Sequence, residues 1–433
     1  MKIKSYISVL LLFMPFLAGA QQAWTLQQCV DTALANNRNV KQQMLTKQTK
    51  EIAYQQARQN LLPNLNASAN QNFVFGRSLA VNNTYQNTNS SQTSFGISSN
   101  ITLFDALKMK HNIDGRKADL YASEADLEKI KSDIALSVST AFLQILLNKE
   151  LLQIATEQIS LTRTNILRRK ELVASGKLAE GEMYELLAQE SKEELSRTQA
   201  ENTLKLSMLD LAQILELDHF EDIDIVIPEN LLESELQLLS AESVFESAIT
   251  HRPEIKGAEY RLQSSEKSVL ATKSDFYPLL TLGAQFGTGY YNSSGLDNNS
   301  FNKQLSDNMS NSIGLNLQIP IFNRFDVRNR VRTAQIGVES SKLNIDNARL
   351  ELRKTIQQAY YNALAAKSRW ETAQKSEIAS REAYRFADQK FESGRGTSYE
   401  LYQAKTNLTQ VLSEQAQAKY EYVFRLKILE ILK

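Results

Sequence analysis

The sequence is poor in the residues that most enzymes use for chemistry. Its 433 residues contain one cysteine, Cys29, and three histidines. A single cysteine excludes an internal disulfide and a thiolate metal cluster. The histidines His111, His219 and His251 lie too far apart to form a metal-ligand spacing. No nucleophile–base pair or phosphate-binding loop is recognisable, so we expect no enzyme activity and no cofactor.

The chain also lacks an excess of either charge. Lysine plus arginine and aspartate plus glutamate each number 49. A basic footprint for nucleic acid is therefore absent, and we expect no nucleic-acid partner. After residue 20, charged or amide residues soon interrupt every apolar run, which argues against a transmembrane helix.

The N-terminus has a different pattern from the rest of the chain. Lys2 and Lys4 precede an apolar core over residues 7–17, and Ala18, Gly19 and Ala20 are small. This pattern predicts a cleaved secretory signal peptide over residues 1–20, because the apolar core is too short to span a bilayer. The mature chain is therefore expected to be exported.

The remainder of the chain is a tandem duplication. ALANNRNVK (33–41) resembles AITHRPEIK (248–256), and Pro63 aligns with Pro278, both at an offset of 215. Further along, ITLFD (101–105) aligns with IPIFN (319–323) at an offset of 218. Self-similarity at a steady offset indicates one structural unit built twice.

Each half has the same predicted plan of a helical segment, two strands, a long helix and a return helix. The first repeat covers 21–217 and the second 241–433, with a connecting segment over 218–240. In the first repeat we expect a helical segment over about 25–60, strands at about 62–76 and 93–105, a long helix over 106–174 and a return helix over 180–216. In the second we expect a helical segment over about 241–275, strands at about 278–291 and 310–323, a long helix over 325–393 and a return helix over 398–433. The segments 77–92 and 292–308, rich in Asn and Ser, are predicted to be solvated loops.

The predicted strands have one apolar and one polar face. In SIGLNLQIPIFN (312–323), apolar residues alternate strictly with small or polar ones, which is the period of a strand. The residues expected on the apolar, lipid-facing side are Leu65, Phe73, Phe75, Phe95, Ile97, Leu282, Phe286, Ile313, Leu315 and Leu317.

The long helices are too long for an ordinary compact domain. Residues 106–174 and 326–393 contain no proline, and about 69 helical residues span roughly 100 Å. Apolar residues recur every seven positions, with Ala, Ser and Thr between them, which is typical of a closely packed coiled coil. The repeating residues are Ile113, Leu120, Leu127, Ile134 and Ala141, with Val331, Val338, Ile345, Leu352 and Ala359 as their counterparts.

Four two-faced strands cannot stand alone in a membrane, because an open sheet leaves its edge backbone groups unpaired in lipid. Two chains would supply eight strands and three would supply twelve. Eight strands leave an interior filled by side chains, whereas twelve leave a water-filled bore that suits the small polar faces. We therefore favour a homotrimer with a twelve-stranded transmembrane β-barrel joined to long α-helical coiled coils.

These features together resemble the TolC-type outer-membrane efflux protein family (outer membrane factors). The resemblance rests on the signal peptide, the duplication, ARQNLLPNL and YPLLTLGA before strands, IPIFNRFDVRNR after one, and turns with an acidic residue six positions past a glycine. It implies a trimeric duct in the outer membrane of a Gram-negative bacterium, with a long α-helical coiled-coil barrel that forms a tunnel through the periplasm. Its implied partners are a periplasmic adaptor (membrane fusion) protein and an inner-membrane pump or transporter. Its implied role is tripartite efflux or type I export of drugs, metals or other cargo.

The resemblance also places functional residues at the turns between the long and return helices. Glu400 and Gln403 are expected to line the pore constriction, although the family's best-studied members carry a second acid where this chain has Gln403. The residues expected at the periplasmic tip, where the adaptor docks, are Gly176, Leu178, Glu182, Gly394, Arg395 and Thr397. Glu182 and Glu400 could instead be helix N-terminal charges favoured by the macrodipole.

Two other functions remain open from the sequence. A passive outer-membrane porin would explain the strands but carries no hundred-ångström coiled coil. A periplasmic coiled-coil scaffold would explain the helices but gives no reason for two-faced strands.

Overall fold

The computed structural model describes residues 24–79, 83–87, 89–176, 179–217, 224–227, 240–294 and 297–433. The predicted signal peptide (1–20), Leu178 and most of the connecting segment 218–240 lie outside these residues. The chain divides into two compact units, one holding residues 41–130 and 245–354 and the other holding 131–244, 355–433 and the N-terminal residues up to 40.

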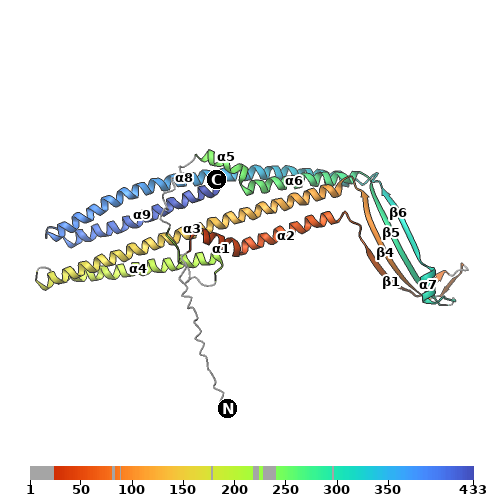
Figure 1. Ribbon diagram of the computed structural model, residues 1–433, viewed down its shortest axis with the longest axis horizontal. Helices are drawn as coiled ribbons and strands as arrows, with labels where there is room; N and C mark the ends of the chain where they lie inside the picture. The colour runs from red at the N-terminus through yellow and green to blue at the C-terminus, as the bar shows by residue number, and fades with distance from the viewer. Residues whose placement is uncertain are drawn as a thin grey trace, which may run out of the picture. The chain divides into compact units, whose positions relative to one another are not determined.

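The elements of the first repeat follow one another in the order of two helices, the strands, a long helix and a return helix (Figure 1). They are α1 (Leu26–Asn36), α2 (Arg38–Gln59), β1 (Asn66–Val74), β2 (Arg77–Leu79), β3 (Tyr85–Asn87), β4 (Ser90–Phe104), α3 (Lys108–Ala174) and α4 (Glu180–Leu215). Those of the second are α5 (Ala241–His251), α6 (Pro253–Lys273), the short 3₁₀ helix η1 (Ser274–Phe276), β5 (Leu279–Ser293), α7 (Phe301–Asp307), β6 (Ser310–Gln318), α8 (Asp326–Glu392) and α9 (Ser398–Leu432).

The helical segment before each sheet is broken in two, where the sequence suggested one. The break falls at Asn37 in the first repeat and at Arg252 in the second, which the duplication makes equivalent positions. The side chain of Asn37 accepts a hydrogen bond from the Asn39 amide at 2.9 Å. Pro253 begins α6, and proline is well tolerated at the first position of a helix.

The two segments predicted to be solvated loops between strands contain secondary structure. One contains the β2–β3 hairpin and the other contains α7. This helix packs on β5, because Phe301 meets Tyr290 edge to face at 5.2 Å between ring centroids and the Thr288 hydroxyl donates to the Leu305 carbonyl at 2.6 Å. Tertiary contacts of this kind override a polar composition that by itself favours a loop.

The connection from β4 to α3 and the connection from β6 to α8 each end in two consecutive residues in the left-handed conformation. Ala106 and Leu107 have φ of 51° and 65°, and their equivalents Arg324 and Phe325 have φ of 53° and 64°. Such a backbone costs non-glycine residues roughly 1–2 kcal/mol each. Its recurrence at the equivalent place in the second repeat shows that the junction is a built feature of the duplicated unit.

The core of the second unit is formed by α1, α3 and α4. Phe142, Ile145 and Leu146 of α3 and Leu211 and Leu215 of α4 are almost completely buried, and each such side chain contributes about 2 kcal/mol. Cys29 and Ala33 of α1 close the cluster.

The sequence led us to expect no helix after residue 20 that could span a membrane, and α3 departs from this expectation. This helix contains an 18-residue window that is long and apolar enough to cross a membrane by length and composition alone. Within the chain 33% of that window is buried, and the apolar side chains of α3 from Val138 to Leu146 pack in the core cluster. Core burial thus accounts for part of the apolar character.

The predicted coiled-coil pattern is confirmed at several heptad positions. Leu127, Val331, Ile345, Leu352 and Ala359 are all buried. Five further alanines of these helices are buried, and small residues let helices approach closely; they are Ala118, Ala122, Ala125, Ala363 and Ala366.

Candidate functional site

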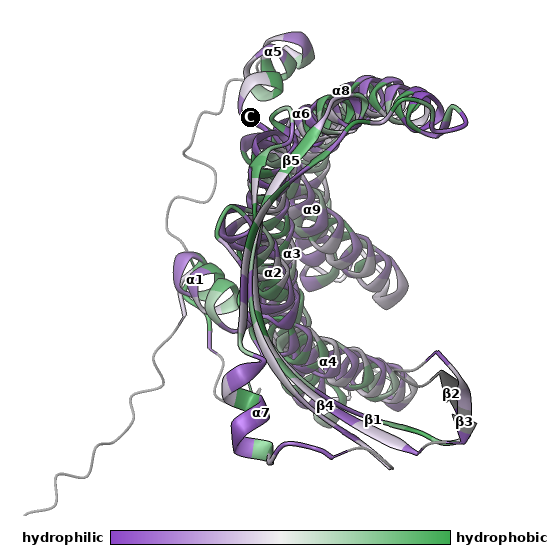
Figure 2. Cartoon of the chain, turned by 90° about the vertical axis from the view of Figure 1, so that its right-hand side faces the viewer, coloured by the Kyte–Doolittle hydropathy of each residue, from purple (hydrophilic) through white to green (hydrophobic). Residues whose placement is uncertain are grey.

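The sheet consists of four antiparallel strands in the order β1–β4–β5–β6. Figure 2 shows it as a curved surface. Ile97 lies opposite Ala67 on one side and Phe286 on the other, and Leu282 lies opposite Leu315. Because side chains alternate between faces along a strand, these pairings place the predicted apolar residues on one face.

The apolar face is largely exposed on the single chain. Ile313 and Leu315 of β6 are 80% and 67% exposed. Phe73, in β1, and Phe75, just after it, are also exposed, and their rings stack at 6.4 Å. Leu65 is exposed and precedes β1, which begins one residue later than that position. A soluble monomer rarely exposes a contiguous apolar surface of this kind.

The opposite face carries small and polar side chains. Ser98 lies opposite Asn66 and Gln285, and Asn100 lies opposite Gly283. A Cβ atom at Gly283 would sit 2.9 Å from the Asn100 side-chain oxygen, so a larger residue does not fit there without a shift. The sheet therefore has one face of small side chains that can form hydrogen bonds and one face of large apolar side chains.

The turns between the long and return helices depend on glycine. Gly176 has φ of 69° and Gly394 has φ of 71°, a conformation that a residue with a Cβ adopts only with strain. The Arg395 and Gly396 amides both donate to the Lys390 carbonyl at 3.0 Å. Arg395 and Thr397 are exposed. The predicted tip residues of the second repeat thus lie together on one tight turn.

The first-repeat residue Glu182 contacts the second repeat. The Ser398 hydroxyl donates to the Glu182 carboxylate, and the Arg169 guanidinium lies 3.8 Å from the same carboxylate oxygen. Arg169 is nearly buried, and its guanidinium stacks over the Phe391 ring at 4.4 Å. Burial lowers the pKa of Arg169 from its usual value, opposed by the charges of Glu182 and Glu185.

Glu400 has local partners on its own chain. Thr397 and Glu400 form a capping box at the start of α9, in which each side chain accepts a hydrogen bond from the other's backbone amide. Both carboxylate oxygens of Glu400 also accept hydrogen bonds from Lys390 at 3.0 Å. The hydrogen bond from Lys390, with that from the Thr397 amide, lowers the pKa of Glu400. Gln403 is exposed one turn further along.

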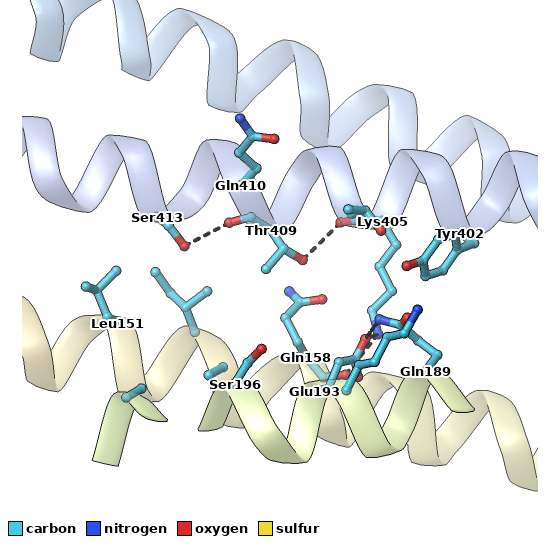
Figure 3. A pocket seen from close by; sticks show the side chains of 15 residues that line it. Leu151, Gln158, Gln189, Glu193, Ser196, Tyr402, Lys405, Thr409, Gln410 and Ser413 are labelled. Carbon is cyan, nitrogen blue, oxygen red and sulfur yellow. Dashed lines mark hydrogen bonds and ion pairs between the residues drawn. The ribbon is translucent and has the colours of Figure 1, made fainter. Parts of the chain in front are cut away.

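A buried charged cluster links the two repeats and was not anticipated from the sequence. The Lys405 ammonium on α9 donates to the Glu193 carboxylate of α4 at 2.9 Å (Figure 3). It also donates to the Gln158 backbone carbonyl of α3 at 3.0 Å and to the Thr162 hydroxyl. The Lys405 and Glu193 side chains are 7% and 12% exposed. Burial lowers the pKa of Lys405, opposed by Glu193.

The cluster borders two cavities of about 470 and 380 Å³, both lined by Gln189, Lys192, Tyr402 and Lys405. A signal for it exists in the sequence, since Lys405 interrupts the stripe formed by Leu401, Leu408 and Val411. A lysine on the buried stripe of a helix needs a partner. In the part of the chain that the structure describes, no group of three or more potential ligands could hold a metal ion.

Comparison with known proteins identifies a family that includes both the sheet and the long helices. A family model described as outer membrane efflux protein matches residues 29–215 and again 244–430. The chain belongs to this family. The double match also confirms the tandem duplication, since one model fits each half.

Individual relatives agree with this assignment. The chain is 25% identical over 416 residues to the toxin and drug export protein A of Aggregatibacter actinomycetemcomitans, covering 92% of this chain and 83% of that protein. In fold it is similar to the VceC outer membrane protein of Vibrio cholerae, with a TM-score of 0.77 and 15% identity over 94% of this chain and 95% of that chain. It is also similar to the CmeC outer membrane channel of Campylobacter jejuni, with a TM-score of 0.78 and 18% identity over 94% and 85% of the two chains.

Membership of the outer membrane efflux family explains why the apolar face of the sheet is exposed on the single chain, since this part of the protein lies in a membrane. The chain is an outer-membrane efflux channel of a Gram-negative bacterium, with a β-barrel in the membrane and a long helical barrel in the periplasm.

Proposed function

We propose that this chain forms a homotrimeric duct that works with a periplasmic adaptor and an inner-membrane pump or transporter. The observation that carries the proposal is the joining of a two-faced sheet to 67-residue helices in each repeat. The apolar face would contact outer-membrane lipid and the polar face would line the bore. The long helices would extend that bore through the periplasm.

The ten apolar sheet residues named from the sequence are the proposed lipid contacts. Eight of them lie on one face of the sheet, Leu65 and Phe75 flank β1, and most of the ten are exposed on the single chain. A charge on a lipid-facing position near the bilayer centre of a barrel costs about 2–4 kcal/mol, whereas the same charge on the lumen side is tolerated. Leu315→Arg should therefore abolish membrane insertion, whereas Asn316→Arg, the neighbouring position on the polar face, should preserve it.

The turns are the proposed contact for the adaptor and the proposed constriction of the pore. Gly176, Glu182, Gly394, Arg395 and Thr397 lie at or beside the two turns, and Leu178 belongs to the same tip by sequence. Three copies of Glu400 and Gln403 would form the narrowest ring. Because each Glu400 is held by Lys390, we propose a ring with little net charge and weak cation preference.

Deletion of residues 174–181 and 392–398 tests this function against a passive porin. The duct requires loss of export while the protein still fractionates with the outer membrane. Unchanged transport by the deletion variant would favour a porin. Recovery of the intact protein in the soluble periplasm would favour a scaffold and contradict both membrane functions.

A further inference from the structure

The connection from β6 to α8 carries exposed aromatic residues at the edge of the sheet that joins the helices. None of the four strands of the sheet contains a charged residue. Beyond the end of β6, Phe322 and Phe325 are 72% and 56% exposed, and their rings meet edge to face at 5.7 Å between centroids. Aromatic residues at the ends of membrane strands lie at the boundary between hydrocarbon and lipid headgroups. Because the helical barrel lies in the periplasm, this boundary belongs to the periplasmic leaflet.

Three exposed arginines accompany these rings. Arg324 directly precedes Phe325, and Arg328 and Arg332 lie in the first two turns of α8. The Asn329 amide donates to the Phe325 carbonyl at 2.9 Å, so the helical spacing already applies from Phe325. Positions three and seven residues further along a helix share its face. Phe325, Arg328 and Arg332 therefore form one stripe that leads away from the sheet.

The length of this stripe suits a lipid headgroup. At 1.5 Å per residue, Arg332 lies about 10 Å further along the helix axis than Phe325. The headgroup region on one side of a bilayer is roughly 5–8 Å thick. Helical side chains lean back toward the N-terminus of their helix, which brings the guanidinium groups of Arg328 and Arg332 closer to the sheet than their Cα atoms.

The three arginines have no counter-charge on their own chain. Within the residues that the structure describes, neither Arg324 nor Arg328 nor Arg332 has an ion-pair partner. Two acids of this region are engaged elsewhere, since Asp275 and Asp326 both pair with Arg330, at 2.8 and 2.9 Å. A guanidinium presents a planar fork of N–H donors that matches the oxygens of a phosphate group.

The first repeat shows that the junction folds without these arginines. Both junctions have two left-handed residues, and in both the first amide of the long helix donates to the carbonyl three residues earlier, at 3.1 and 3.0 Å. Subtracting the repeat offset of 218 from Arg324, Phe325, Arg328 and Arg332 gives Ala106, Leu107, Lys110 and Asp114. The first repeat thus has one cation and one acid where the second has three cations. The same backbone forms in both cases, which favours a ligand over a structural role for the arginines.

We propose that Arg324, Arg328 and Arg332 bind the phosphodiester headgroup of an anionic phospholipid in the periplasmic leaflet. Its acyl chains would lie along the apolar face of β6, which continues to Ile321, 94% exposed. The ligand needs negative charge to offset the arginines and hydrocarbon to meet the rings, and an anionic phospholipid has both. A zwitterionic lipid brings its own cation and fits less well. The inference depends on the position of the sheet in the outer membrane and goes beyond the proposed duct.

Native mass spectrometry of the purified mature protein in a non-ionic detergent measures lipid binding and oligomeric state together. The probes are phosphatidylglycerol and phosphatidylcholine with the same acyl chains. The wild type should bind phosphatidylglycerol at least about tenfold more tightly, since each cation near the headgroups adds attraction to an anionic lipid. The preference should weaken as the ammonium acetate concentration rises.

Two triple variants decide whether the arginines cause this preference. Arg324→Gln/Arg328→Gln/Arg332→Gln should bind phosphatidylglycerol no more tightly than phosphatidylcholine, with its phosphatidylcholine affinity and melting temperature unchanged. The matched control removes the same charge from exposed lysines of the other compact unit and should keep the preference; it is Lys170→Gln/Lys192→Gln/Lys375→Gln.

Three results would overturn the proposal. The first is equal affinity of the wild type for the two lipids, and the second is a preference that persists in the arginine variant. The third is an arginine variant that loses its oligomeric state while the remaining chains keep the preference, because the arginines would then contact a neighbouring copy. None of these results bears on export, so the proposed duct is tested separately.

A lysine variant separates charge from hydrogen-bonding geometry. Arg324→Lys/Arg328→Lys/Arg332→Lys keeps the three charges but loses the planar fork. Its affinity for phosphatidylglycerol should lie between those of the wild type and the glutamine variant. An affinity equal to that of the glutamine variant would contradict a charge-based site.

Discussion

The buried pair between Lys405 and Glu193 makes a quantitative prediction about how the two repeats are held together. The ammonium has partners on α3 and α4 and is 7% exposed. Removing one partner of a buried ion pair costs about 3–5 kcal/mol, because the other charge is left without compensation. Glu193→Ala should therefore destabilise the contact between α9 and α4 by at least about 3 kcal/mol.

Lys405→Met should cost less than Glu193→Ala. The Glu193 carboxylate would keep a hydrogen bond from Thr162 at 2.5 Å and one from Gln189 at 2.7 Å, so a loss of about 2 kcal/mol is expected, the typical value of a hydrogen bond to a charged group. Replacing both partners, in Lys405→Met/Glu193→Met, should be near neutral, because well-packed apolar residues often equal a buried ion pair.

Hydrogen–deuterium exchange with mass spectrometry of peptides covering 398–410 and 185–197 measures these differences locally. At about 1.4 kcal/mol per factor of ten, Glu193→Ala should accelerate exchange at least about 100-fold, while the double variant stays near wild type. Lys205→Met is the matched control, since its pair with Glu201 is exposed to solvent and such pairs contribute little to stability. Equal exchange rates in the wild type and Glu193→Ala would refute the reasoning. So would a double variant Lys405→Met/Glu193→Met that exchanges as fast as Glu193→Ala.

Three further predictions concern the turns and the core. The pKa of Glu400 is lowered by Lys390, so its stabilisation is present above the ordinary value of 4.5 and is lost as the pH falls through the lower folded value. The melting temperature of Glu400→Gln should lie below that of wild type at pH 7 and converge with it in acid, and a constant difference would contradict this. Gly396→Ala would place a Cβ 3.0 Å from the Phe391 amide nitrogen and should destabilise the turn by about 1–3 kcal/mol. Gly181→Ala, in the first turn of α4 with nothing within 4 Å, should instead stabilise by about 0.5–1 kcal/mol, and thermal melting compares the two. Burial raises the pKa of the Cys29 thiol to about 11, so Ellman's reagent at pH 8 should react at least tenfold faster in urea than with native protein, and equal rates would contradict its burial.

Much of the fold could be predicted because its signals are periodic. Alternation in β6 identified the exposed apolar positions, and the heptads identified Leu127, Ile345 and Leu352 as buried. The repeat offsets also relate two observed registers to each other, because the pairing of β1 with β4 reproduces that of β5 with β6.

Features that depend on contacts between distant residues could not be predicted in the same way. The α7 helix is short and polar, and its partners are on β5. Lys405 meets residues 212 and 243 positions away in the chain, and sequence distance gives no hint of that proximity. The capping box of Thr397 and Glu400 differs, since Thr-x-x-Glu is a local signature that the sequence does contain.

The central claim, that the chain forms a duct with its narrowest point at the helix turns, is tested most directly by single-channel conductance. Purified mature protein and its Glu400→Ala/Gln403→Ala variant would be compared in planar bilayers. The variant loses two side chains from the proposed ring and also the bonds of Glu400 to Lys390 and Thr397. A small resting conductance that rises in the variant is the predicted result. No conductance from either protein, with the material recovered in the aqueous phase, would contradict the claim.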